Sequence, residues 1–182
     1  MPGRLDGQRV LIFVGEVYED LELLYPRYRL IEEGARVTLA GLDAPGTLYR
    51  GKHGYPVASD ARVSDIDPAR FDALVVPGGF MPDRLRRDDS VKRITRAMHE
   101  AGKPLAHICH GGWIPISAGV VRGYTVTSTP GIRDDLINAG AEWVDREVVV
   151  DRHHITSRRP DDLPAFCRAI IAKMAGGRGE SG

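Results

Sequence analysis

Cys109 is the residue whose type and setting most strongly suggest chemistry. It ends an apolar run, and Gly111 and Gly112 follow it. A nucleophile at a tight strand-to-helix turn needs a small residue two positions later, because the helix must pack close to the strand. The free N–H groups at a helix start stabilise a thiolate, and the neighbouring His110 is a candidate base. We predict a reactive thiol at Cys109, whereas Cys167 lies in an apolar helical stripe and is structural.

Two further segments could complete a site around this thiol. Gly78 and Gly79 follow a buried run, and their backbone N–H groups could form an oxyanion hole with the amide of His110 or simply make a turn. Three glutamates spaced by three residues follow the first apolar run: Glu16, Glu19 and Glu22. A carboxylate at a helix start is ordinary, but one that enters the cleft would be a hydrogen-bond donor with a raised pKa. The sequence does not decide which of the three points inward.

Metal and cofactor binding are not predicted. A metal site would have to use His107, Cys109 and His110, for which no fourth ligand is evident. The histidine pair at 153–154 has no partner pattern in the sequence. The stretch 177–182 matches G-x-G-x-x-G, but no strand precedes it and no helix follows it, so it is not a dinucleotide site.

The elements that would position these residues alternate along the chain. Short apolar runs predict parallel strands, and amphipathic stretches predict the helices that connect them. We predict strands at 9–15, 36–42, 72–76, 104–108 and 124–128, an excursion with short strands at 47–60, and a hairpin at 147–151 and 154–157. Helices are predicted at 20–33, 90–102, 110–118, 133–139 and 161–175. This is the pattern of an α/β fold, a three-layer αβα sandwich with a doubly wound, mostly parallel sheet.

One helix has an apolar face that its spacing defines clearly. In the helix 20–33, that face holds five residues: Leu21, Leu24, Tyr25, Tyr28 and Ile31. Gly34 is a good helix stop, and Pro26 should kink the helix unless it lies in the first turns. We expect the apolar face to pack inward.

Length and composition restrict the function classes. The 182 residues suit one domain, 1–182, with a core at about 9–174 and a Gly-rich tail at 176–182 that we expect to fray. The 25 basic and 25 acidic residues balance, which argues against a nucleic-acid partner. No apolar run approaches the roughly 18 residues of a membrane helix. The start lacks a signal-peptide core, and two cysteines make no disulfide framework, so we expect a cytoplasmic protein.

Four local sequences together resemble the ThiJ/PfpI family. They lie at 19–23, 51–55, 77–79 and 106–111. The resemblance is closest to the PfpI-type intracellular cysteine protease branch, within the class I glutamine amidotransferase-like superfamily, and it spans about residues 9–174. It implies a flavodoxin-like sandwich that assembles as a homodimer or homohexamer.

The resemblance also implies roles for individual residues. It makes Cys109 the nucleophile, His110 its histidine partner and Glu22 the acid that hydrogen-bonds the sulfur. The oxyanion donors would be the amides of Gly79 and His110. The acid partner of His110 would come from a neighbouring subunit, at Asp83, where the proteases of this branch commonly have Glu.

The surroundings of the thiol depart from the family pattern at two positions. Gly112 stands where proline is usual, and Thr129 replaces an aromatic residue or histidine. These two residues would line the pocket together with Glu19, Gly111 and Trp113. The departures leave the thiol intact and concern substrate specificity.

We therefore predict a cysteine-dependent hydrolase of the PfpI type with a stress-protective role. Cys109 would attack the carbonyl group of a peptide, an amide, a small α-oxoaldehyde or the adducts that such aldehydes form on proteins. No cofactor is required, and the partners are the substrate and further copies of the chain. The alternative is a redox-sensing or chaperone-like stress protein in which Cys109 is oxidised reversibly without turnover.

Overall fold

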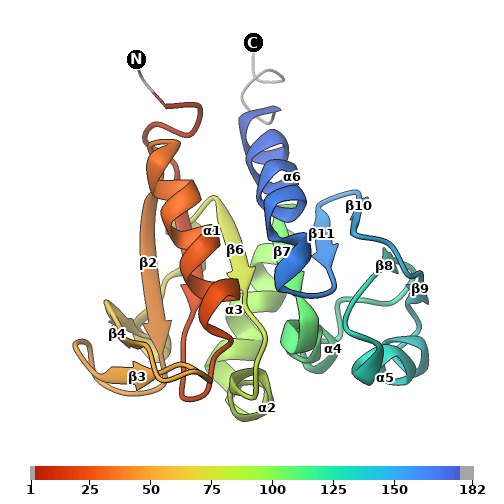
Figure 1. The fold of residues 1–182 in the computed structure, drawn as a ribbon, viewed down its shortest axis with the longest axis horizontal. Coiled ribbons are helices and arrows are strands. Elements are labelled where there is room, and N and C mark those ends of the chain that lie inside the picture. The colour runs from red at the N-terminus through yellow and green to blue at the C-terminus, as the bar shows by residue number, and fades with distance from the viewer. Residues whose placement is uncertain (1–2, 177–182) are drawn as a thin grey trace.

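A seven-stranded sheet forms the centre of the computed structural model, which describes residues 3–176. The strand order is β10-β11-β7-β6-β1-β2-β5, and every pair is parallel except the antiparallel pair β10–β11 (Figure 1). The strands are β1 (Arg9–Phe13), β2 (Arg36–Gly41), β5 (Ala61–Arg62), β6 (Ala73–Val76), β7 (Leu105–Ile108), β10 (Val148–Asp151) and β11 (His154–Ser157). The predicted hairpin is therefore the edge of the main sheet.

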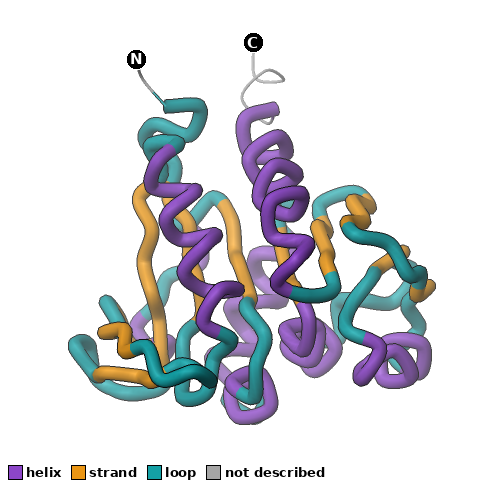
Figure 2. Tube along the Cα trace, viewed as in Figure 1, coloured by secondary structure: helices purple, strands orange, loops and turns teal. Residues whose placement is uncertain are grey.

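Helices cover both faces of this sheet. In Figure 1, α1 and α6 lie side by side on one face, and α3 and α4 lie on the other. The helices are α1 (Asp20–Glu32), α2 (Met81–Leu85), α3 (Asp89–Glu100), α4 (Trp113–Ala118), α5 (Arg133–Asn138) and α6 (Leu163–Gly176). The alternation of helices and strands along the chain is visible in Figure 2. The predicted three-layer, mostly parallel α/β sandwich is confirmed.

The central strands owe their place to continuous apolar sequence. The residues of β6 and β7 are all buried, as parallel strands covered on both faces must be. Burial of each Val, Leu or Ile side chain contributes about 1.5–3 kcal/mol to folding. The carboxyl ends of β1, β6 and β7 meet at one edge, which brings the three chemistry-bearing segments of the sequence together.

A small hairpin packs beside this edge and confirms the predicted excursion at 47–60. It consists of β3 (Leu48–Arg50) and β4 (Pro56–Ala58). Two carboxylates hold the hairpin by its backbone N–H groups. Glu16 Oε2 accepts from the N–H of Arg50 at 2.6 Å. The carboxylate of Asp20 accepts from the N–H of His53 at 2.8 Å and from the N–H of Tyr55 at 3.2 Å. The hairpin is thereby fixed to the start of α1.

The predicted strand at 124–128 is wrong in extent and in partner. Only Thr125–Val126 is extended and paired, as β8, and it pairs in parallel with β9 (Glu142–Trp143) outside the main sheet. Ser128 cannot continue a strand, because its hydroxyl bonds the carbonyl of Thr129 and a 3-10 turn begins at Pro130. Together with α5, this pair forms a separate lobe at the right of Figure 1.

The rotation of α1 is opposite to the predicted one. Inward residues include Leu23, Pro26 and Leu30 together with Glu22, and the helix continues through Pro26. Four of the five residues of the apolar face defined by spacing point outward, with Leu21 55%, Tyr25 36%, Tyr28 56% and Ile31 46% exposed, whereas Leu24 is half-buried and packs against the core. The first turn explains the difference: the buried carboxyl groups of Asp20 and Glu22 are held by backbone N–H groups, and this fixes the helix rotation.

The last helix, α6, reaches the end of the described residues. Gly176 closes α6, while the rest of the expected frayed tail and the G-x-G-x-x-G match at 177–182 lie outside the described residues. Among residues 3–176, no helix is long and apolar enough to cross a membrane.

Candidate active site

Cys109 occupies a strained turn directly after β7. Its φ is 58°, and it opens a 3-10 turn, Cys109–Gly112, that leads into α4. A left-handed conformation costs a residue other than glycine about 1–2 kcal/mol. A Cβ at Gly111 would lie 2.4 Å from the carbonyl oxygen of Val76, so only glycine permits this approach to β6. The local sequence therefore folds as the predicted elbow.

His110 is a titratable side chain in direct contact with the thiol. Its Nδ1 lies 3.3 Å from Cys109 Sγ, a contact that adjacency in sequence alone did not guarantee. Burial first, and the charge of Lys52 second, lower the pKa of His110, so its imidazole is neutral near pH 7. In the tautomer with an unprotonated Nδ1, it can accept the thiol proton.

Glu22 is the glutamate that points into the site. It is fully buried, and its Oε2 accepts the backbone N–H of Gly78 at 2.8 Å. Burial, reinforced by the charge of Glu19, raises the pKa of Glu22 from 4.5 to about 8, so the carboxyl is protonated at neutral pH and can donate to Cys109. Glu19 instead caps α1 by accepting from the N–H of Glu22 at 2.8 Å.

Opposing influences act on the Cys109 thiol, which is half-buried. Burial, followed by the nearby Glu22 carboxyl, raises its pKa to about 12 and outweighs the hydrogen bonds from the backbone N–H groups of His110 and Gly79, which act to lower it. The thiolate expected from the helix start alone is therefore not favoured in the free site, and the thiol must lose its proton to a base. The repulsion from Glu22 disappears when that carboxyl is protonated. The two amides that face the sulfur are the predicted oxyanion donors, so the site can receive negative charge on sulfur or on an adjacent oxygen.

The Gly78–Gly79 pair leaves no space for side chains at this place. A Cβ at Gly78 would lie 2.5 Å from Glu22 Oε2 and 2.8 Å from the Cβ of Cys109. Gly79 has a φ of 86°, and a Cβ there would lie 2.5 Å from the backbone nitrogen of Glu19. Glycine is thus required by direct contact with the site rather than by a turn alone.

Within one chain, the fold does not place Asp83 beside the other predicted catalytic residues. It lies in α2, and its carboxylate accepts from Arg87 Nη2 at 2.5 Å. Within residues 3–176, no hydrogen bond joins Asp83 to His110. Asp83 lines a hollow of about 350 Å³ at the surface, together with Phe80 and Trp113 among others.

The combination of elbow, buried glutamate and double glycine agrees with a known family. The model of the DJ-1/PfpI family matches residues 8–173. The chain belongs to the DJ-1/PfpI family. The resemblance drawn from the local sequences is thereby confirmed.

Curated DJ-1/PfpI relatives match nearly their whole length. A deglycase of Pyrococcus horikoshii is 50% identical over 163 residues, which cover 90% of this chain and 97% of the relative. The deglycase PfpI of Pyrococcus furiosus is 48% identical over the same shares of both chains. YraA of Bacillus subtilis, named as a candidate cysteine protease, is 43% identical over 91% of this chain and 97% of its own.

Solved structures of the DJ-1/PfpI family share the fold. The DJ-1/ThiJ/PfpI-like and ferritin-like two-domain protein of Anabaena variabilis superposes with a TM-score of 0.90 at 32% identity, over 96% of this chain and 52% of that one. Drosophila melanogaster DJ-1beta gives a TM-score of 0.86 at 27% identity, over 93% of this chain and 91% of that one.

The structure gives a physical reason for one departure from the DJ-1/PfpI pattern. A Cβ at Gly112 would lie 3.0 Å from Ile132 Cδ1 and 3.5 Å from His107 Nδ1. The imidazole of His107 is fully buried, its pKa is lowered to about 3 by burial, and neither ring nitrogen has a hydrogen-bond partner. The tight approach is the one to Ile132, whereas the contact with the His107 ring would be an ordinary one.

The other predicted pocket residues border the elbow. Trp113 packs against the ring of His110, with 5.1 Å between ring centroids, and donates its indole N–H to Asp135 at 2.7 Å. Thr129 is half-buried and precedes the 3-10 turn Pro130–Ile132. A Cβ at Gly131, in that turn, would lie 3.5 Å from His110 Nε2, so this segment forms one wall beside the imidazole.

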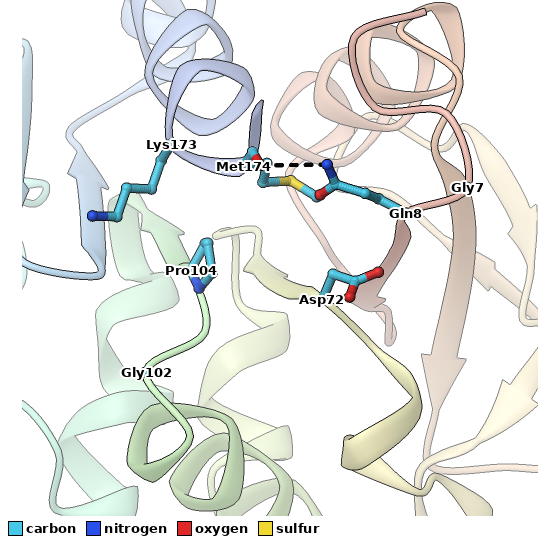
Figure 3. A pocket seen from close by; sticks show the side chains of 7 residues that line it. All are labelled: Gly7, Gln8, Asp72, Gly102, Pro104, Lys173 and Met174. Atoms are coloured by element: carbon cyan, nitrogen blue, oxygen red, sulfur yellow. Dashed lines mark hydrogen bonds between the residues drawn. The ribbon is translucent and has the colours of Figure 1, made fainter. Parts of the chain in front are cut away.

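A cavity of about 460 Å³ lies at the opposite edge of the sheet and takes no part in this site. Figure 3 shows its lining, which includes Gln8, Asp72 and Met174. Gln8 Nε2 donates to the carbonyl of Met174 at 3.3 Å, and Asp72 accepts from the backbone N–H of Arg9 at 2.7 Å. Gln8 and Asp72 thus already have internal partners, and among residues 3–176 the lining contains no cysteine, serine or histidine.

Proposed function

We propose that this chain is a cysteine-dependent hydrolase of the deglycase type, which removes α-oxoaldehyde adducts from amino groups. The observation that carries the proposal is the contact of 3.3 Å between Cys109 Sγ and His110 Nδ1 at a strained elbow. The amides of Gly79 and His110 face the same sulfur, and Glu22 lies beside it. Nucleophile, base and oxyanion donors are thus within reach of one substrate carbon.

The reaction that we propose needs no oxidant. His110 accepts the thiol proton, and Cys109 Sγ bonds the carbon that carries the amine while the C–N bond breaks and the amine leaves with that proton. The resulting hemithioacetal becomes a thioester when a proton moves from this carbon to the adjacent carbonyl carbon and the hydroxyl proton moves to the former ketone oxygen, with the charged oxygen held by the Gly79 and His110 amides. Water then cleaves the thioester, so one water is added and a free amine and a 2-hydroxy acid are released.

The names of the archaeal relatives, at 48% and 50% identity, support this choice over peptide hydrolysis. Proteolysis would need an extended groove for a peptide chain. The hollow of about 350 Å³ beside Trp113 does not have Cys109 or His110 among its lining residues, and its volume suits a small adduct better than several peptide residues. The chemistry also requires a reduced thiol, which favours the cytoplasm as its compartment.

The decisive assay compares the wild type with Cys109→Ser. The substrate is the methylglyoxal adduct of an N-acetylated lysine or arginine, and both the freed amino acid and the 2-hydroxy acid are measured. An excess of an aldehyde scavenger removes free methylglyoxal, so that release faster than spontaneous dissociation identifies the adduct itself as substrate. A Cys167→Ser variant is the matched thiol control and should keep full activity.

Other results would assign other functions. Turnover of free methylglyoxal alone would indicate a glyoxalase, and cleavage of a fluorogenic peptide would indicate a protease. Absence of any Cys109-dependent turnover, with a sulfinic mass gain at Cys109 after mild peroxide, would favour the redox-sensing alternative.

We further propose that the site is completed in a homo-oligomer. The outward apolar face of α1 exposes Leu21, Tyr25, Tyr28 and Ile31, and a second copy of the chain would cover it. Asp83 is 44% exposed and is free to approach His110 of a neighbouring copy if its bond to Arg87 opens. Mixing Cys109→Ala subunits with Asp83→Ala subunits after dissociation should then restore some active sites. No recovery would mean that Asp83 acts within its own chain or not at all.

A further inference from the structure

Three histidines from distant parts of the chain meet at the amino-terminal edge of the sheet. His99 comes from the last turn of α3, His153 from the turn between β10 and β11, and His154 from the start of β11. His99 Nδ1 lies 2.9 Å from His154 Nε2 and 3.0 Å from His153 Nε2. One nitrogen from each of the three rings lies within 4.8 Å of the other two.

Hydrogen bonds alone cannot satisfy this arrangement. A nitrogen of a neutral imidazole carries either one hydrogen or one lone pair in the ring plane. His99 Nδ1 nevertheless faces two other ring nitrogens at hydrogen-bonding distance. It can form one well-aligned bond, and the second contact must share the same lone pair or the same hydrogen, which weakens both. A cation between the three rings would accept all three lone pairs at once.

The spacing is close to that of a metal site. Zn²⁺ binds histidine nitrogen at about 2.0–2.1 Å, so two nitrogens of a tetrahedral site are about 3.3–3.4 Å apart. The two contacts of 2.9 and 3.0 Å differ from this by about half an ångström or less. The third pair, His153 with His154, lies within 4.8 Å. It closes further if the half-exposed His153 ring turns about its side-chain bonds.

The surroundings hold one ligand rigidly and leave the others accessible. His154 is fully buried and stacks on Tyr124, with 4.1 Å between ring centroids. His99 and His153 are half-exposed, so an ion can enter from solvent and keep water as its fourth ligand. The carbonyl end of α3, where His99 lies, favours a positive charge.

Two positive charges, those of Arg152 and Lys173, act on the His153 ring. Arg152 lies over the ring of Tyr124, with its guanidinium carbon 3.4 Å from the centroid. Its charge is balanced by Asp151, whose carboxylate accepts from Arg152 at 3.1 Å and 3.3 Å, and it also bonds the carbonyl of Gly123. Arg152 is therefore held by other partners and leaves the three ring nitrogens free.

We propose that this cluster binds a divalent first-row transition metal ion, with Zn²⁺ as the best match. The ligands are His99 Nδ1, His153 Nε2 and His154 Nε2, with water in the fourth position. The ion links α3 to the edge hairpin β10–β11. An all-imidazole donor set suits Zn²⁺, Cu²⁺ and Ni²⁺ and disfavours Mg²⁺ and Ca²⁺.

This metal site is separate from the cysteine site. β7 and β11 run parallel, with His154 opposite Leu105 and Ser157 opposite Ile108. The histidines thus lie at the start of these strands and Cys109 follows their end, about 13 Å away by the strand rise. The ion is a structural link and does not take part in the attack on substrate.

The test uses the full-length, tag-free chain after treatment with EDTA. Titration with Zn²⁺ in a calorimeter should give one ion per chain, and Co²⁺ should develop the visible absorption of a tetrahedral nitrogen site. His153→Ala and His99→Gln should each weaken Zn²⁺ binding by at least about tenfold, because loss of even an outer-shell partner costs 10–100-fold. Saturating Zn²⁺ should raise the melting temperature of the wild type and not that of these variants.

His53→Ala is the matched control. His53 has a side chain that is 66% exposed and lies outside the cluster, so its removal should leave Zn²⁺ binding unchanged. Circular dichroism and the labelling rate of Cys109 verify that each variant is folded. The proposal is overturned if the wild type binds no ion, if it binds with equal affinity in both cluster variants, or if His53→Ala weakens binding as much as they do.

Discussion

The protonation of Glu22 can be tested through stability. Glu22→Gln keeps an oxygen to accept the Gly78 N–H and replaces the acid with an amide that is neutral at every pH. In the folded protein, burial and Glu19 raise the pKa of Glu22 from 4.5 to about 8, against the opposing effects of the Gly78 N–H, Cys109 and Lys52. Between these two values the folded protein keeps a proton that the unfolded chain has released.

The sign and size of the effect follow from that difference. Because the folded state binds the extra proton, the free energy of unfolding falls as pH rises through this window, by about 1.4 kcal/mol per pH unit. Between pH 5 and pH 7 the wild type should lose about 2–3 kcal/mol through Glu22 alone. Glu22→Gln lacks this loss. The variant should therefore gain that amount relative to the wild type over the same range.

The assay is urea unfolding at pH 5, 6 and 7 and at one protein concentration. Both proteins carry Cys109→Ser, so that titration of the thiol does not contribute. Glu32→Gln is the control, because the Glu32 side chain is 71% exposed and lies on the same helix as Glu22 but away from Cys109. A flat difference for Glu22→Gln would show that Glu22 is ionised in the folded protein. Its role as a donor to the Cys109 sulfur would then be wrong.

Three further predictions concern the elbow, its packing and the assembly. Iodoacetamide should label Cys109 much faster than Cys167, which is 1% exposed in α6, and equal rates in peptide mass spectra would contradict the elbow assignment. Gly111→Ala should lower the free energy of unfolding, measured with urea, by about 1–3 kcal/mol, because its Cβ would lie 2.4 Å from a backbone oxygen. Gly131→Ala is the control and should be nearly neutral, because the nearest atom to its Cβ would lie 3.5 Å away. Tyr28→Glu, on the outward face of α1, should shift the mass measured by light scattering to smaller species, and an unchanged mass would mean that this face is not the contact.

The sequence was sufficient to predict β1, β2, β6 and β7, because these strands are apolar runs between helical patterns, but it missed the two-residue edge strand β5. It was insufficient for the rotation of α1. Five apolar residues share one face there, yet the buried face carries Glu22, because bonds to backbone N–H groups from other segments fix the first turn. Spacing within one helix contains no information about such partners. The apolar face of a helix is also ambiguous evidence, because a face that packs against another chain and a face that packs against the protein's own core are both apolar.

The parts of the candidate site that are adjacent in the sequence could be predicted. The residues that come together only in the folded chain could not. Cys109, His110 and Gly111 are adjacent, and the glycine spacing alone indicated the elbow. The histidine cluster joins His99 to a pair more than 50 positions later, through the pairing of β7 with β11. A signal was available: His99 ends a predicted helix just before one strand, and His154 begins another. Using it would have required the strand order, which the sequence reasoning left open.

The attachment of the β3–β4 hairpin has a consequence for how selectivity can change in this family. Glu16 and Asp20 hold the hairpin by main-chain N–H groups, which every residue except proline carries, so the side chains at its tip can vary without loosening it. Gly51 and Gly54 are the exceptions, since a Cβ at Gly51 would lie 2.3 Å from an Asp20 oxygen and Gly54 has a φ of 92°. Lys52, by contrast, acts through its charge on both His110 and Glu22. Mutational libraries confined to such tip positions could therefore retune the enzyme while its scaffold stays the same.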